Sequence, residues 1–194
     1  MPDKSNGKVR IIGGLWKRTP IPVLNAKGLR PTGDRQRETL FNWLEFLCGG
    51  LQGLNALDMF GGSGALSLEF LSRGGRGCVL FETNRAAARA VTGIAEKLSA
   101  QNLSVLPTNS LCSPLLGERG PYDVVFIDPP FAENLQLHAL RVCLPHLSPQ
   151  GLVYVESPEE IKEDTLSEYA LKAVRRAKSG ASYMLLAQKK DAEV

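Results

Sequence analysis

Residues 56–64, Ala-Leu-Asp-Met-Phe-Gly-Gly-Ser-Gly, join an apolar run to a helical pattern through a turn that contains three glycines. The run Ala56–Phe60 predicts a buried strand, and the spacing of apolar residues in Ala65–Ser72 predicts a helix. Glycine at such a turn adopts backbone angles that other residues avoid, and it lets a ligand approach the main chain. The spacing differs from the G-x-G-x-x-G of a dinucleotide loop, and no Gly-Lys-Ser/Thr phosphate loop follows. The turn therefore indicates a nucleoside ligand that lacks phosphates, and a purely structural turn is the alternative.

The same alternation of apolar runs and helical periods continues along the chain. Further helices are expected at about Arg85–Leu98 and Leu135–Leu144, between buried strands, which is typical of a doubly wound α/β sheet. Two extended runs near the end, Ser167–Val174 and Ser182–Gln188, predict a closing antiparallel hairpin. The further apolar runs that predict strands of the sheet are Gly77–Phe81, Leu103–Leu106, Val124–Ile127 and Leu152–Val155.

The segment before this pattern predicts a hairpin followed by a helix. Two short extended runs, Lys8–Ile12 and Leu15–Leu24, flank a Gly-Gly turn, and two prolines in the second run restrict it to an edge hairpin. A helix is expected from about Asp34 to Cys48, with Thr32 as its cap and a Gly-Gly pair at its end. We therefore expect a basic N-terminal arm over residues 1–32 and one α/β domain over 33–194. The apolar stripe of the helix consists of Leu40, Phe41, Leu44 and Leu47.

Positive charge is concentrated at the start of the chain. Residues 1–37 carry a net charge of +7, whereas the remainder carries −4, within a total of +3. A cationic segment beside a slightly acidic body indicates a polyanionic partner that binds from one side, and a merely solvated charged segment is the alternative. The residues expected to contact such a partner are Lys8, Arg10, Lys17, Arg18, Arg35 and Arg37.

Length, hydropathy and cysteine spacing exclude several classes of protein. A chain of 194 residues fits one globular domain, its apolar runs are far shorter than the 18 residues of a membrane helix, and its first residues are polar. The four cysteines lie 30 or more residues apart and form no C-x-x-C pair, so we expect no metal site. Buried free thiols in a cytoplasmic protein are the expectation.

Polar residues follow the predicted strands where a sheet of this type binds ligands, beyond the strands' carboxyl ends. Glu82 follows the second run and is placed to accept both hydroxyls of a ribose, and Thr108-Asn109-Ser110 follows the third and is placed to hold an adenine edge. The fourth run ends in Asp128-Pro129-Pro130-Phe131. Because proline fixes φ near −65°, this tetrapeptide presents a carboxylate and a carbonyl rigidly, with an aromatic ring alongside.

Together these motifs resemble the S-adenosylmethionine-dependent methyltransferases, which have a Rossmann-like, seven-stranded, mostly parallel sheet. Asp-Pro-Pro-Phe resembles the motif of enzymes that methylate exocyclic amines of bases. The stretches RIIGGLWKRTPIPV, GLRPTGDRQRETLFNWL and YVES (154–157) resemble the bacterial 16S ribosomal RNA guanine-N2 methyltransferase family, and the likeness spans about residues 8–190. This resemblance implies methyl transfer from S-adenosylmethionine to the N2 amine of guanine 966 in 16S ribosomal RNA.

The resemblance also implies a cofactor site and partners. Asn84 stands where the family commonly has an acid, so Glu82 alone would hold the ribose. The implied partner is 16S ribosomal RNA, free or in a partly assembled small subunit, and we expect a monomer. The implied cofactor-binding residues are Arg30, Thr32, Asp58, Phe60, Gly61, Gly62, Ser63, Gly64, Glu82, Thr83, Asn109, Ser110, Leu111 and Asp128.

The catalytic residues expected from this chemistry are the four of the Asp-Pro-Pro-Phe motif. A guanine N2 amine is a poor nucleophile because its lone pair delocalises into the ring. The Asp128 carboxylate and the Pro129 carbonyl can accept hydrogen bonds from the two amine protons and orient the nitrogen, while Phe131 stacks against the base and Pro130 keeps the turn rigid. An aspartate is too weak a base to deprotonate the amine beforehand, so the proton should leave after methylation begins.

Other functions share parts of this pattern. An adenine-N6 DNA methyltransferase would share Asp-Pro-Pro-Phe, although it usually needs a separate target-recognition region. A protein-glutamine or small-molecule methyltransferase would not require the cationic segment. A non-enzymatic RNA-binding protein on the same fold is the remaining alternative.

Overall fold

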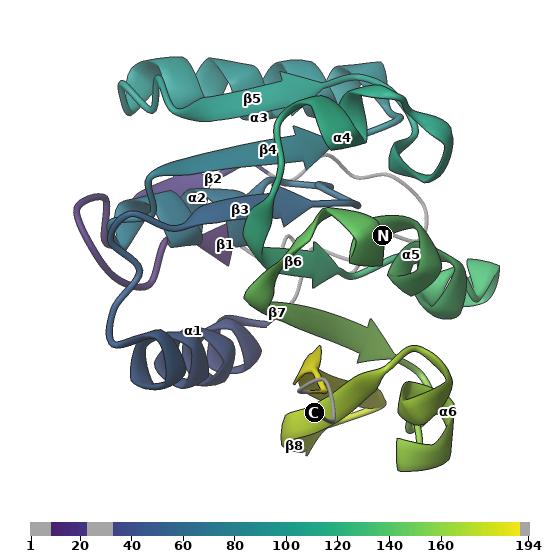
Figure 1. Ribbon diagram of the computed structural model, residues 1–194. Coiled ribbons are helices and arrows are strands. Elements are labelled where there is room, and N and C mark those ends of the chain that lie inside the picture. Colours follow the sequence, from purple (N-terminus) through teal and green to yellow (C-terminus); the bar gives the residue numbers. More distant parts are fainter. Residues whose placement is uncertain (1–8, 23–32, 191–194) are drawn as a thin grey trace, which may run out of the picture.

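The computed structural model describes residues 9–22 and 33–190, and its centre is a seven-stranded sheet (Figure 1). The strand order is β5-β4-β3-β6-β7-β9-β8, in which the first five strands are parallel and β9 is antiparallel to both of its neighbours. The strands are β3 (Asn55–Asp58), β4 (Gly77–Phe81), β5 (Leu103–Leu106), β6 (Tyr122–Ile127), β7 (Leu147–Ser157), β8 (Leu171–Ser179) and β9 (Ser182–Lys189).

Helices cover both faces of the sheet, so successive strand residues pack into opposite cores. Side chains of α1 and α2 pack with Val124 and Phe126 on one face, and side chains of α4, α5 and α6 pack with Val125 and Ile127 on the other. A smaller cluster joins α2 and α3 to the N-terminal hairpin. The helices are α1 (Asp34–Cys48), α2 (Ala65–Ser72), α3 (Arg85–Lys97), α4 (Leu115–Glu118), α5 (Gln136–Cys143) and α6 (Glu163–Glu168), with short 3-10 helices η1 (Ser110–Cys112), η2 (Phe131–Glu133) and η3 (Leu144–His146).

The expected fold class is confirmed: a doubly wound sheet closes with an antiparallel C-terminal hairpin. Two parallel strands, β4 and β5, have the bounds that the apolar runs predict. The expected strand at 167–174 begins too early, because α6 continues to Glu168 and Ala170 adopts a left-handed backbone with φ 54°. The strand β8 starts only at Leu171, and a bulge interrupts its pairing between Ala173 and Arg175.

The N-terminal hairpin forms a separate two-stranded sheet, not an edge of the main one. Strand β1 (Val9–Arg10) pairs with β2 (Pro20–Ile21), and residues 15–18 form a turn where an extended run was expected. The carboxylate of Glu69 on α2 accepts hydrogen bonds from the backbone amides of Ile12 (2.7 Å) and Gly13 (2.8 Å). Glu69 is fully buried, so the hairpin is anchored to the helix by a charged acceptor. The division of the chain into an arm and a domain stays a prediction.

Three expectations for the first helix and the thiols are wrong. The N-cap of α1 is Gly33, whose amide donates to the side chain of Gln36, and Thr32 lies outside the described residues. Leu47 points toward solvent and is 37% exposed, because the stripe that packs on the sheet ends at Leu44. Among the thiols, Cys78 and Cys143 are buried, but Cys48 and Cys112 are exposed.

Within the described ranges, no helix has the length and apolar character needed to cross a membrane.

Candidate active site

The five parallel strands end at one edge of the sheet, and the loop that follows β3 is tied there to β4 and β6. Asp58 on β3 lies opposite Leu80 on β4 and Phe126 on β6. Beyond the strand, the Met59 amide donates to the Phe126 carbonyl (3.1 Å), and the Gly61 amide donates to the carbonyl of Phe81 (2.8 Å). This edge therefore brings together the glycine turn and the residues that follow β4, β5 and β6.

The glycine turn is closely packed as well as conformationally special. Gly64 is the N-cap of α2 with φ 75°, and a Cβ atom at this position would lie 2.8 Å from Val91. At Gly61, a Cβ atom would lie 2.3 Å from the side chain of Leu80. Any larger residue at either position would push the turn off β4 and α3.

Asp58 lies beneath this turn and is almost fully buried. One carboxylate oxygen, Oδ2, accepts a hydrogen bond from the Ser67 hydroxyl (2.7 Å), whereas Oδ1 is buried without a hydrogen-bond partner in the described part of the chain. Burial raises the pKa of Asp58 to about 6, and the Ser67 hydrogen bond opposes this shift. The negative charge of Glu82 adds to the rise in the pKa.

Glu82 follows β4 and holds the adjoining loops in place. Its Oε2 accepts a hydrogen bond from the Gly62 amide (2.7 Å), and its Oε1 accepts one from the Asn84 amide (2.6 Å). Asn84 has a different task, because its side chain accepts hydrogen bonds from the amides of Ala86 and Ala87 and caps α3. The absence of an acid at position 84 thus leaves Glu82 as the carboxylate beside the turn.

After β5, one polar residue is buried and the one before it is exposed. The Ser110 hydroxyl is buried and donates to the Met59 carbonyl (2.8 Å), so it links two loops and is not available to an adenine edge, contrary to expectation. Asn109 is exposed, and its side chain accepts a hydrogen bond from the Leu111 amide (2.9 Å). Thr83, on the neighbouring loop, is also exposed.

The Asp-Pro-Pro-Phe segment leaves β6 at the same edge. Asp128 is half-buried, Pro129 is buried and Pro130 is exposed with φ −54°. Phe131 begins η2, which ends at Asn134 in a left-handed conformation with φ 49°. The aromatic side chain is half-buried at the start of a tight turn, three residues after Asp128.

Behind this segment lies a buried polar network that sequence reasoning missed. Glu156 is 3% exposed and accepts hydrogen bonds from the Tyr154 hydroxyl (2.7 Å) and the Ser182 hydroxyl (2.9 Å). Ile127 pairs with Val155, so Asp128 follows β6 at the level of Glu156 on β7. Burial, together with the charges of Glu156 and Asp128, raises the pKa of Tyr154 well above its usual value. The available signal was a tyrosine and a glutamate on one face of an otherwise apolar run.

The basic residues expected to contact RNA are not gathered at this edge. Arg37 is fully buried and donates to the Arg10 carbonyl (2.7 Å) and to Asp34 (2.8 Å), so its expected role as an RNA contact is wrong. Arg10 is exposed and forms an ion pair with Asp34. Lys17 and Arg18 are exposed on the hairpin turn, beside the last residue of α2. Arg35 is exposed in the first turn of α1, and Lys8, Arg30 and Thr32 lie outside the described residues.

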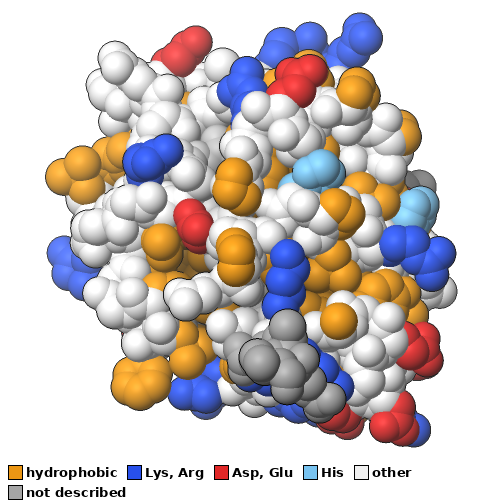
Figure 2. All heavy atoms as spheres, viewed as in Figure 1, with side chains coloured by type: hydrophobic (Ala, Val, Ile, Leu, Met, Phe, Trp, Pro, Cys, Tyr) orange, Lys and Arg blue, Asp and Glu red, His pale blue; other side chains and the backbone are white. Residues whose placement is uncertain are grey.

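Because α2 runs back from the glycine turn, its end and the hairpin turn lie at the opposite edge of the sheet (Figure 1). The face seen in Figure 2 shows basic and acidic side chains scattered among hydrophobic ones, without a broad patch of either sign. The structure thus separates the hairpin cations from Asp128.

The residues at the carboxyl edge fit S-adenosylmethionine by their chemistry. Glu82 offers a half-buried carboxylate to a pair of hydroxyl groups, which suits a ribose. The buried Oδ1 of Asp58 lacks a donor, which a polar or cationic group of a ligand could supply. The glycine turn leaves Gly62 and Ser63 half-buried and carries no phosphate-binding motif, which suits a nucleoside that carries no phosphate.

Comparisons with known proteins agree with this geometry. Residues 9–188 match the family described as conserved hypothetical protein 95. Ribosomal RNA small subunit methyltransferase D of Escherichia coli strain K12 is 41% identical over 158 residues, which cover 80% of this chain and 77% of the relative. The protein of the same name from Haemophilus influenzae is 39% identical, with coverage of 80% and 82%.

A solved structure described as the putative methyltransferase yhhF from Escherichia coli superimposes with a TM-score of 0.79. It shares 36% sequence identity and covers 95% of this chain and 99% of its own. The match to the family model spans nearly the whole of the described structure, the carboxyl edge included. This chain belongs to the conserved hypothetical protein 95 family, together with relatives named as methyltransferases of small-subunit ribosomal RNA.

Proposed function

We propose that this chain is an S-adenosylmethionine-dependent methyltransferase that modifies the exocyclic N2 amine of a guanine in 16S ribosomal RNA, at position 966. The observation that carries the proposal is the placement of Asp128 and Phe131 at the same sheet edge as the glycine turn and Glu82. The names of the curated relatives support ribosomal RNA as the substrate class, which agrees with a cytoplasmic location.

The residues of this edge have separate roles in the proposed reaction. Glu82, Asp58 and the half-buried backbone around Gly62 would hold the cofactor, and the bound cofactor supplies a methyl group already activated by its sulfonium centre. The Asp128 carboxylate and the Pro129 carbonyl accept hydrogen bonds from the target amine and orient its nitrogen for in-line attack. Asp128 then receives the proton that leaves as the nitrogen becomes positively charged.

Phe131 supplies a stacking surface for an extruded base. The two prolines keep this aromatic ring and the carboxylate in a fixed relation, because neither φ angle can change freely. A fixed acceptor pair stabilises the charge that develops on the amine more than it stabilises the neutral amine, which is the requirement for a faster chemical step.

The experiment that tests this function is nucleoside analysis after incubation with labelled S-adenosylmethionine and 16S ribosomal RNA, either free or in small subunits. We expect N2-methylguanosine as the labelled product. Asp128→Ala should lower kcat at least ~100-fold, with a much smaller effect on cofactor affinity. Label in N6-methyladenine of DNA would instead support the adenine-directed alternative, and a near wild-type rate for Asp128→Ala would remove this residue from the chemistry.

A further inference from the structure

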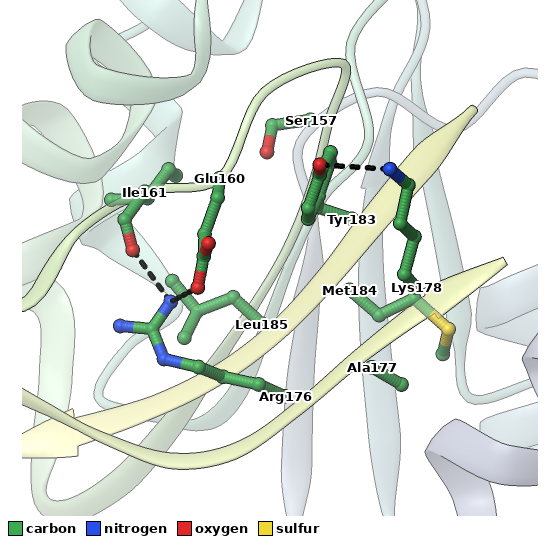
Figure 3. Close-up of a pocket in the computed structure, with 9 residues that line it drawn as sticks. All are labelled: Ser157, Glu160, Ile161, Arg176, Ala177, Lys178, Tyr183, Met184 and Leu185. Carbon is green, nitrogen blue, oxygen red and sulfur yellow. Dashed lines mark hydrogen bonds and ion pairs between the residues drawn. The ribbon is translucent and has the colours of Figure 1, made fainter.

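A cavity lies beside the proposed catalytic edge, at the end of the C-terminal hairpin. It has a volume of about 170 Å³. Figure 3 shows Tyr183 and Lys178 facing each other on β9 and β8, with Arg176, Glu160 and Ile161 on the other side of the cavity. The comparisons and the proposed reaction assign no role to this group of residues.

The cavity lies in the same row of the sheet as the catalytic strand end. Ser157, the last residue of β7, lies opposite Tyr183, and Tyr183 lies opposite Lys178. The neighbour of β7 on its other side is β6, which leads directly into Asp128. Since adjacent strands are about 4.8 Å apart, Tyr183 lies roughly 10 Å from the line of β6 and Lys178 roughly 14 Å.

Lys178 is the cation at this site that remains available to an anion. Its Nζ donates to the Tyr183 hydroxyl (2.9 Å) and lies 4.5 Å from the centre of the Tyr183 ring. Arg176 is already neutralised, because it pairs with Glu163 (3.1 Å) and Glu160 (3.7 Å) and donates to the Ile161 carbonyl. Among the ion pairs formed by residues 9–22 and 33–190, none includes Lys178.

The bulge in β8 determines which face carries these groups. Ala173 lies opposite Ala187, but Arg175 lies opposite Leu186, so one extra residue enters β8 between them. After the bulge, Arg176 pairs with Leu185 and Lys178 with Tyr183, on the face that carries α6. The bulge therefore places both cations and the tyrosine around one cavity.

We propose that this cavity binds an unpaired nucleotide that flanks the methylated base, with its base stacked on Tyr183 and its phosphate near Lys178. Aromatic rings interleaved with cations are how proteins hold single-stranded RNA. The paired carboxylates around Arg176 make the site a poor trap for a free anion, whereas the tyrosine ring with Ile161 and Leu185 offers the apolar surface that a base requires. This inference rests on the proposed RNA methyltransferase function.

The test compares Tyr183→Ala with Tyr183→Phe, using 16S ribosomal RNA as the probe. Loss of one stacked base corresponds to a rise in KM and in the RNA dissociation constant of roughly 5- to 150-fold for the alanine variant. The phenylalanine variant keeps the ring and should remain near wild type, which also separates loss of stacking from loss of folding. Phe46→Ala is the matched control, because Phe46 is an exposed aromatic residue on α1.

Lys178→Ala tests the phosphate contact separately. The log–log dependence of RNA affinity on salt should become less steep by about 0.7–0.9, whereas Lys97→Ala, an exposed lysine at the end of α3, should leave it unchanged. Wild-type RNA affinity and KM in Tyr183→Ala would overturn the inference. A wild-type protein that transfers no methyl group to ribosomal RNA would defeat the proposed function instead, and filter binding, which needs no reaction, would still decide whether the cavity holds RNA.

Discussion

Replacing Asp58 with asparagine should change how the stability of the protein depends on pH. Burial raises the pKa of this carboxyl from 3.8 to about 6 in the folded chain. A carboxyl with a raised pKa holds its proton more tightly in the folded state than in the unfolded state. The contribution to stability is therefore fully present below pH 3.8 and is lost as the pH rises through 6.

The pKa difference of about 2 units corresponds to about 3 kcal/mol over the whole range, and about 1 kcal/mol of it falls between pH 5 and 7. Asp58→Asn cannot titrate, so its free energy of unfolding should improve relative to wild type by that amount over this interval. Urea unfolding, followed by circular dichroism at a series of fixed pH values, measures the free energy of unfolding of both proteins. If the free energy of unfolding depended on pH in the same way in wild type and variant, the pKa of Asp58 would not be raised in the folded chain.

A second substitution tests the hydrogen bond that Asp58 accepts from Ser67. Ser67→Ala removes the hydroxyl that donates to Asp58 Oδ2 and favours its charged form. The pKa of Asp58 in the folded chain should therefore rise further, and the loss of stability should continue to a higher pH than in wild type. A shift toward lower pH would contradict the assignment of the hydrogen bond.

Three further substitutions address the cofactor site, the hairpin and its surface. Glu82→Ala should weaken S-adenosylmethionine binding by roughly 1.5–3 kcal/mol in calorimetry, as hydrogen bonds to a charged group do, and equal affinities would remove Glu82 from the site. Glu69→Ala should destabilise the fold by about 3–5 kcal/mol in urea unfolding, because Arg73 and two hairpin amides lose their buried acceptor, and a loss under 1 kcal/mol would be inconsistent with that anchor. Replacing both Lys17 and Arg18 with alanine should reduce the salt dependence of RNA binding by about 1.5 in log–log slope with unchanged cofactor affinity, and an unaltered slope would confine RNA to other surfaces.

The sheet was predictable because its signals are local. Each parallel strand is a short apolar run, and the carboxyl end of each run is followed by a polar or glycine-rich segment such as Gly61–Gly64. The strand order places those segments together, so Glu82 and Asp128 could be assigned to one edge from their positions alone. The bounds of β4 and β5 follow directly from the same pattern.

What the sequence did not reveal depends on contacts between distant residues. Arg37 has the charge expected of an RNA contact, but it is buried, where it donates hydrogen bonds to a backbone carbonyl on the hairpin and to Asp34. Ser110 has the polarity of a ligand contact, but its hydroxyl is used by the Met59 carbonyl 51 residues away. The position of the hairpin turn depends on Glu69 and on the length of α2, neither of which composition can show.

The length of α2 determines where the chain tolerates insertions. All eight residues of α2 are buried, its first turn continues the glycine segment, and its last residues, Glu69 and Ser72, hold the hairpin. One added residue would rotate everything beyond it by about 100° and advance it by about 1.5 Å, so the glycine segment and the hairpin could not both keep their partners. Variants with altered spacing should survive in the exposed turn at Gly180, where a Cβ atom would meet nothing within 4 Å, and fail within this helix. The helix acts as a spacer of fixed length and phase between the two edges of the sheet.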